Sequence, residues 1–151
     1  MIIAGVDCST RKIAIFRIED GRGVASEITC NEHDTSTRIN VMFQAVVDVI
    51  KKLKPDMVYI ENSPYLQNIK VTLAIHSVVD AVRYACVLAK VPFQTVEVTS
   101  WKKDVLGNGR ADKDEIFQFA KAKWGEDIIK NQDVADSACI CLYGWRRMHN
   151  D

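Results

Sequence analysis

The sequence predicts a single α/β domain, a mixed β-sheet flanked by helices, that takes up residues 1–151. Three observations predict this fold. The length is that of one domain, and 48% of the residues are apolar, which is enough for a hydrophobic core. Three β-rich segments open the chain in direct succession, as in an antiparallel meander. Two later ones alternate with amphipathic helices, as parallel strands do.

The three opening strands are predicted from runs of apolar and β-branched residues. They span residues 1–6, 12–18 and, with a weaker pattern, 24–30. The segment EDGRG at 19–23 separates the second from the third, and its acidic and glycine residues are typical of a hairpin loop.

Helices are predicted wherever apolar residues recur three and four positions apart. These segments are 35–54, 68–90, 112–124 and 131–148. Lysines in the last turn and Pro55 mark the end of the first helix. Asp112 and Glu115 have the spacing of a capping box, which marks the start of the third.

Two more strands are predicted between the helices, at 57–60 and 93–98. The segment WKKDVLGNGR at 101–110 is expected to be a helical turn that breaks into a glycine loop. The chain has no internal repeat, low-complexity stretch or linker, which supports one domain.

Composition excludes several classes of protein. The charges balance at 20 Lys+Arg against 20 Asp+Glu, so bulk charge neither favours nor excludes a nucleic-acid partner. No apolar run approaches the ~18 residues of a membrane helix, and the N-terminus lacks the basic region of a signal peptide. The five cysteines are odd in number and contain no CxxC pair, so we expect reduced thiols in a soluble, cytoplasmic protein without a membrane partner.

Four acidic residues are candidates for one site. Asp7 and Glu61 each end an apolar strand, and neighbouring strands place their ends a few ångströms apart. Asp133 and Asp136 are three positions apart, hence on one face of a helix that carries no charge from Ser137 to Trp145. The alternatives are solvated strand-end acids and an ordinary acidic first helical turn.

Four clustered carboxylates suit hard divalent cations. Mg²⁺, and Mn²⁺ in its place, prefer oxygen ligands, and two such ions about 3.5–4 Å apart can clamp a phosphoryl displacement. The three histidines lie outside these motifs, which argues against a zinc hydrolase. The segment GNGRADK adds Arg110, a glycine turn and Lys113 at a helix start, which together favour phosphate, although a plain loop before a capped helix has the same pattern.

The segments MIIAGVD, VYIEN, WKKDVLGNGRADKDEI and DVADSACICL, in this order and spacing, resemble the RuvC-type Holliday junction resolvases, including phage-type members, of the RNase H-like superfamily. The resemblance covers about residues 1–147. It implies a five-stranded mixed sheet in the order 3-2-1-4-5. It also implies a homodimer that cuts opposed strands of branched DNA, most readily four-way junctions, with two Mg²⁺ ions at each site.

The resemblance also implies roles for individual residues. The catalytic and metal-binding acids would be Asp7, Glu61, Asp133 and Asp136. Lys102 and Lys113 match lysines near the scissile phosphate, and the DNA-contacting residues would be Lys102, Lys103, Arg110, Lys113 and Tyr65.

This sequence departs from the family pattern in three places. Cys8 and Ser9 follow Asp7 where proline and glycine are frequent. Pro64 stands near the position of an aromatic wedge, for which Tyr65 is the substitute. The helix at 68–90 lacks the glycine-rich pattern of the family's dimer interface, and its apolar stripe is either core or interface.

Three alternative functions remain at this point. The opening hairpin also resembles that of actin-like ATPases and sugar kinases, but the chain lacks their second domain and second phosphate motif. A non-catalytic nucleic-acid-binding module is disfavoured because it has no use for four mutually repelling carboxylates. A nuclease for flaps, forks or other branched DNA has the same sequence features.

Overall fold

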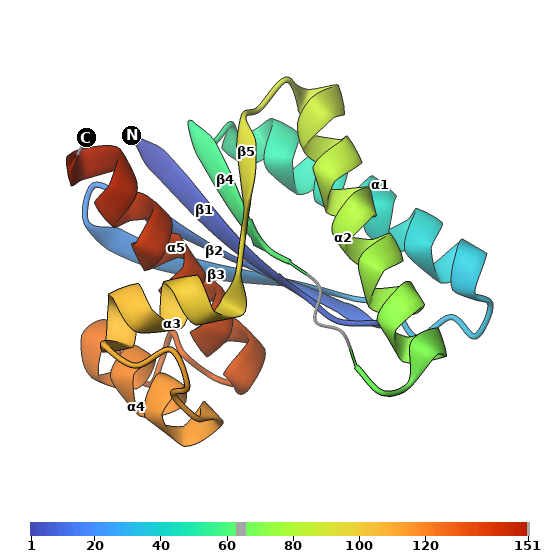
Figure 1. Cartoon of the computed structure of the whole chain (residues 1–151). Coiled ribbons are helices and arrows are strands. Elements are labelled where there is room, and N and C mark those ends of the chain that lie inside the picture. The colour runs from blue at the N-terminus through green and yellow to red at the C-terminus, as the bar shows by residue number, and fades with distance from the viewer. Residues whose placement is uncertain (63–65, 151) are drawn as a thin grey trace.

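The structure, a computed structural model, describes residues 1–62 and 66–150. Five strands form one mixed sheet in the order β3-β2-β1-β4-β5, which confirms the predicted fold (Figure 1). The strands are β1 (Ile2–Cys8), β2 (Lys12–Glu19), β3 (Arg22–Thr29), β4 (Met57–Glu61) and β5 (Phe93–Val96). The helices are α1 (Thr35–Leu53), α2 (Ile69–Ala89), α3 (Val98–Leu106), α4 (Lys113–Trp124) and α5 (Gln132–Asn150).

Strand directions follow the connections along the chain. The strand pairs β1–β2 and β2–β3 are antiparallel, whereas β1–β4 and β4–β5 are parallel and are joined through helices. In the central parallel pair, Val6 lies opposite Ile60. The carboxyl ends of β1 and β4 therefore meet at one edge of the sheet.

Helices cover both faces of the sheet and create two hydrophobic cores. In Figure 1, α1 and α2 lie on one side of the sheet, and α3, α4 and α5 lie on the other. Side chains of β1 alternate between the two: Ala4 and Val6 pack toward α1 and α2, whereas Ile3 packs toward α5. Asp7 has the same parity as Ile3, so its side chain belongs to the α5 face.

Helix α5 is buried against the sheet from Val134 to Gly144, except at Asp136, which agrees with its charge-free stretch. A Cβ on Gly5 would overlap the backbone of Ser137 and Cys141, and one on Gly144 would overlap the Tyr59 ring. Two glycines at the contacts, one on the strand and one on the helix, allow this close approach.

The structure differs from the prediction between 93 and 106. The strand β5 ends at Val96, not at 98, and α3 is a complete helix of nine residues rather than a turn. Trp101 and Val105, four positions apart, are the buried residues of α3. The alternating pattern of the strand continues into the first helical residue, which hides the boundary in the sequence.

Among the residues that the structure describes, α2 is the one helix long and apolar enough to cross a membrane by length and composition. Eight of its residues are buried in this domain, where it packs against α1 and the sheet. This packing is that of a core helix.

Candidate active site

Asp7 and Glu61 are side by side at the carboxyl edge of the sheet. Each follows a residue of the in-register pair Val6–Ile60, so the two acids occupy the next position on adjacent parallel strands. Both side chains have the parity of the residues that pack toward α5. The strand pairing thus directs two carboxylates to the same face of the sheet.

Helix α5 brings two further acids to this edge. Asp133 and Asp136 lie in its first two turns, and the helix begins with Asn131 accepting a hydrogen bond from the Val134 amide. Gln132 donates to Asp136 Oδ1 over 2.9 Å. Lys12 Nζ lies 3.5 Å from Asp133 Oδ2, so within the described part of the chain Asp133 is the one acid of the four in an ion pair.

The electrostatics show that these acids share one site. Burial raises the pKa of Asp7 well above its usual value, and the charges of Glu61, Asp136 and Asp133 raise it further. Three carboxylates from β4 and α5 thus act directly on the one from β1. The structure brings together all four acids that the sequence singles out.

Two more of these acids hold protons unusually tightly. Burial raises the pKa of Glu61 to about 7; the hydrogen bond from Trp101 lowers it, and the charge of Asp136 raises it. Burial also raises the pKa of Asp136 to about 6, despite the hydrogen bond from Gln132. A cation bound among these groups would relieve both the burial cost and the mutual repulsion.

Trp101 is a site residue that sequence reasoning missed. Its indole Nε1 donates to Glu61 Oε2 over 2.6 Å, while its ring is 1% exposed in the core between the sheet and α5. The two residues are 40 positions apart, so no local pattern reveals the contact. The available signal is a tryptophan placed directly before two lysines in a glycine-containing segment.

The basic residues predicted to contact phosphate divide into two groups. Lys102 lowers the pKa of both Glu61 and Asp136, and Lys113 lowers that of Asp136, so both positive charges lie near enough to act on the acids. Lys103 lies exposed on α3, and Arg110 lies exposed on the loop before α4. Tyr65, the predicted wedge, lies outside the described residues.

The acids suit a hard divalent cation by their chemistry. Among residues 1–62 and 66–150, no three His, Cys, Asp or Glu side chains converge tightly enough to hold a metal ion as they stand. The donor set nevertheless consists of carboxylate oxygens that are largely buried and repel one another. Such groups fit Mg²⁺ or Mn²⁺, whose charge offsets the repulsion.

This sheet order, with acids at the ends of β1 and β4 and helix α5 packed across the sheet, is that of an RNase H-like fold. The family model for "Crossover junction endodeoxyribonuclease RuvC" matches residues 3–143, and the chain belongs to this family. That membership excludes the ATPase and sugar kinase alternative.

Relatives and solved structures agree with this assignment. The RuvC endonuclease of Solidesulfovibrio magneticus is 26% identical over 155 residues, covering 97% of this chain and 92% of the relative. That of Salinibacter ruber is 29% identical over 159 residues, covering 100% and 89%. Thermus thermophilus RuvC in complex with a Holliday junction substrate has the same fold, with a TM-score of 0.84 at 18% identity over 99% of this chain and 96% of that one.

Proposed function

We propose that this protein is a metal-dependent endodeoxyribonuclease that resolves four-way DNA junctions in the cytoplasm. Family membership supports the enzyme class and the substrate. The observation that carries the proposal is the cluster of four mutually repelling carboxylates, which a non-catalytic binding module has no reason to hold.

The acids have distinct places in the proposed chemistry. Asp7, Glu61 and Asp136 would hold Mg²⁺, or Mn²⁺ in its place, as two ions per site, and Asp133 would complete the site or position water. When bound there, the ions would supply Lewis-acid activation of the phosphodiester and of an attacking water. The chain's own part is to hold its carboxylates in fixed positions on β1, β4 and α5, so that little reorganisation accompanies the reaction.

The α3–α4 segment would bind the DNA backbone. Lys102 and Lys113 act electrostatically on Asp136, so their positive charges would lie near a phosphate bound at the acids. Lys103 and Arg110 extend this charge over the exposed surface of the same segment. The N-terminus of α4, at Lys113, adds the partial positive charge of the helix dipole.

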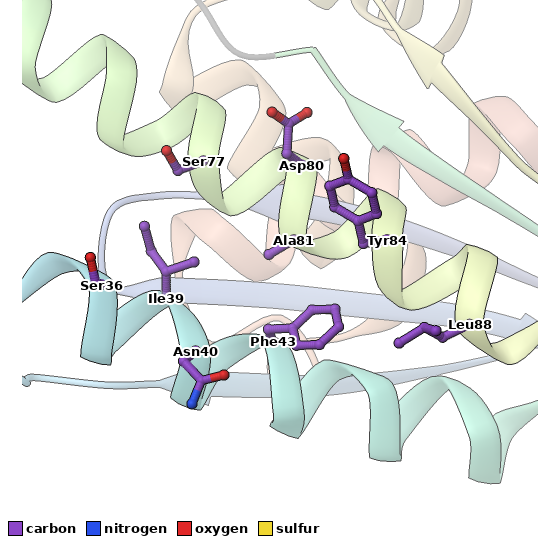
Figure 2. Close-up of a pocket in the computed structure, with 9 residues that line it drawn as sticks. All are labelled: Ser36, Ile39, Asn40, Phe43, Ser77, Asp80, Ala81, Tyr84 and Leu88. Atoms are coloured by element: carbon purple, nitrogen blue, oxygen red, sulfur yellow. The ribbon is translucent and has the colours of Figure 1, made fainter.

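Paired nicks in opposed strands need two sites, and one chain supplies one, so the active form is a homodimer with two-fold symmetry. Helix α2 is the proposed interface because it exposes large apolar side chains, among them Leu73, Tyr84 and Val87. A groove of about 610 Å³ runs between α1 and α2 (Figure 2). Phe43 of α1 and Tyr84 and Leu88 of α2 line it.

A cleavage assay tests the function. Synthetic four-way junctions, flaps, replication forks and plain duplex are each incubated with the protein and Mg²⁺, and the nicks are mapped. We expect paired nicks in opposed strands of the four-way junction and little cleavage of duplex. Preferential cutting of flaps or forks would identify the branched-DNA alternative, and binding of junctions without cleavage would identify a non-catalytic module.

A further inference from the structure

We infer that Trp101 is a positioning residue for Glu61. Its indole N–H holds one oxygen of the Glu61 carboxylate, so that the other oxygen is available to a divalent cation. This inference rests on the proposed function in one respect, the role of Glu61 as a metal ligand.

The geometry of the pair is fixed by the protein core. Trp101 is 1% exposed and packs in the hydrophobic cluster beneath α5, so its ring has a single orientation. The indole carries one donor and no acceptor, and a buried donor needs a partner. That partner is Glu61 Oε2, 2.6 Å away. The bond therefore restricts the Glu61 side chain through a rigid group, as an outer-shell partner of a metal ligand does.

The partners of these acids differ in charge. The more deeply placed acids accept from neutral donors, and the outermost acid pairs with a cation. Glu61 accepts from a neutral indole and Asp136 from the neutral amide of Gln132, while the outer Asp133 pairs with the charged Lys12. A cationic partner neutralises a carboxylate and competes with a metal ion, whereas a neutral donor orients the carboxylate and leaves its charge available. Glu61 and Asp136 thus have the partners expected of metal ligands.

Helix α3 connects this bond to the phosphate-facing lysine. Trp101 and Lys102 are consecutive, and Lys102 Nζ lies 5.9 Å from the centre of the indole ring. The indole anchors α3 to the core, and the positive charge of the next residue lies near enough to Glu61 and Asp136 to lower their pKa values. One short helix therefore carries both the donor that holds Glu61 and a positive charge that acts on it.

Metal binding without DNA tests the inference. Mn²⁺ affinity is measured by calorimetry for the wild type, Trp101→Phe and the control Trp124→Phe, which removes an indole that packs on Phe16 in the same core. We expect Trp101→Phe to bind Mn²⁺ about 10-fold more weakly, as for other outer-shell substitutions. Trp124→Phe should match the wild type. Equal Mn²⁺ affinity in Trp101→Phe and the wild type, or an equal loss in both variants, would overturn the assignment.

A second measurement does not need Trp101→Phe to fold. The chain has three tryptophans, so the ¹⁵N-labelled protein gives three indole N–H signals, and Trp124→Phe and Trp145→Phe assign that of Trp101 by elimination. We expect the Trp101 signal to exchange slowest with solvent and to shift in Glu61→Gln while the other two stay in place. A Trp101 signal that does not respond to Glu61→Gln would overturn the inference. Neither of these measurements uses DNA. Failure to cut junctions would therefore contradict the proposed function without contradicting the inference about Trp101.

Discussion

Gly5 of β1 lies directly against the backbone of Cys141 in α5, with no room for a Cβ between them. Two residues beyond this contact, β1 carries Asp7, and five residues before it, α5 carries Asp136. The Cys141 thiol also donates to the Ile3 carbonyl oxygen over 3.1 Å. The close approach of strand and helix thus brings the acids of β1 and α5 to one site.

The first prediction concerns this contact. Gly5→Ala should lower the free energy of unfolding by at least about 1–3 kcal/mol, because the added methyl group meets backbone atoms that cannot rotate away. Thermal unfolding followed by circular dichroism measures the change. The matched control is Gly109→Ala, where a Cβ makes an ordinary 3.4 Å contact with the Thr99 carbonyl oxygen. If both variants unfold at the wild-type temperature, the close packing of β1 on α5 is wrong.

The second prediction concerns pH. The pKa of Glu61 rises from 4.5 to about 7 on folding, and that of Asp136 rises from 3.8 to about 6. The folded state therefore binds these protons more tightly than the unfolded state does. The stability that they contribute is complete below about pH 4 and is lost as the pH rises to about 7. With EDTA present to remove metal ions, the ionisation of these two acids should lower the melting temperature as the pH rises over this interval.

Two comparisons isolate that contribution. Glu61→Gln, which cannot ionise, should make the melting temperature in EDTA depend less on pH between 4 and 7 than that of the wild type. Mg²⁺ should stabilise the wild type more at pH 7.5 than at pH 5.5, because bound metal needs deprotonated carboxylates. Identical pH profiles for Glu61→Gln and the wild type would contradict the electrostatic description of the site.

The third prediction concerns the DNA backbone. Lys113→Ala should weaken binding to four-way junctions and lower the slope of log affinity against log salt by about one, the effect of one lost phosphate contact. Lys52→Ala, in the last turn of α1 at the far end of the sheet, is the control of equal charge and should keep the wild-type slope. Fluorescence anisotropy across salt concentrations measures both. A wild-type slope in Lys113→Ala would make Lys113 a helix-start residue rather than a phosphate contact.

The fourth prediction concerns assembly. Tyr84→Glu places a charge on the exposed apolar face of α2 and should convert the dimer to monomers without unfolding them, since Tyr84 is 66% exposed. The control is Val41→Glu on α1, where Val41 is 45% exposed and lies outside the groove. Light scattering at micromolar concentration measures the mass. A wild type that remains a monomer on junction DNA would favour single nicks in flaps or forks.

Local patterns in the sequence were enough to predict the five strands and to single out the four acids as candidates for one site, whereas the order of the strands came from the family resemblance. Asp7 and Glu61 end apolar strands, and the parity of each strand determines the face to which its last residue points. The charge-free stretch after Asp136 reveals that α5 is buried. These signals are local, so one sequence suffices to read them.

Contacts between segments that are distant in the sequence could not be predicted from such local patterns. The bond between Trp101 and Glu61 joins residues from α3 and β4, and the need for glycine at position 5 comes from α5, more than 130 residues later. The start of α3 was missed because the alternation of β5 runs into it. Each of these features depends on how two elements meet, which no local window contains.

The central claim is that the four-acid site cuts DNA, and Asp7→Asn tests it most directly. The substitution keeps the size of the side chain and removes the ionisable group on which the charges of the other three acids act. With Mg²⁺ and a four-way junction, the variant should bind the junction with wild-type affinity and make no nicks. Cleavage by Asp7→Asn at close to the wild-type rate would contradict the claim.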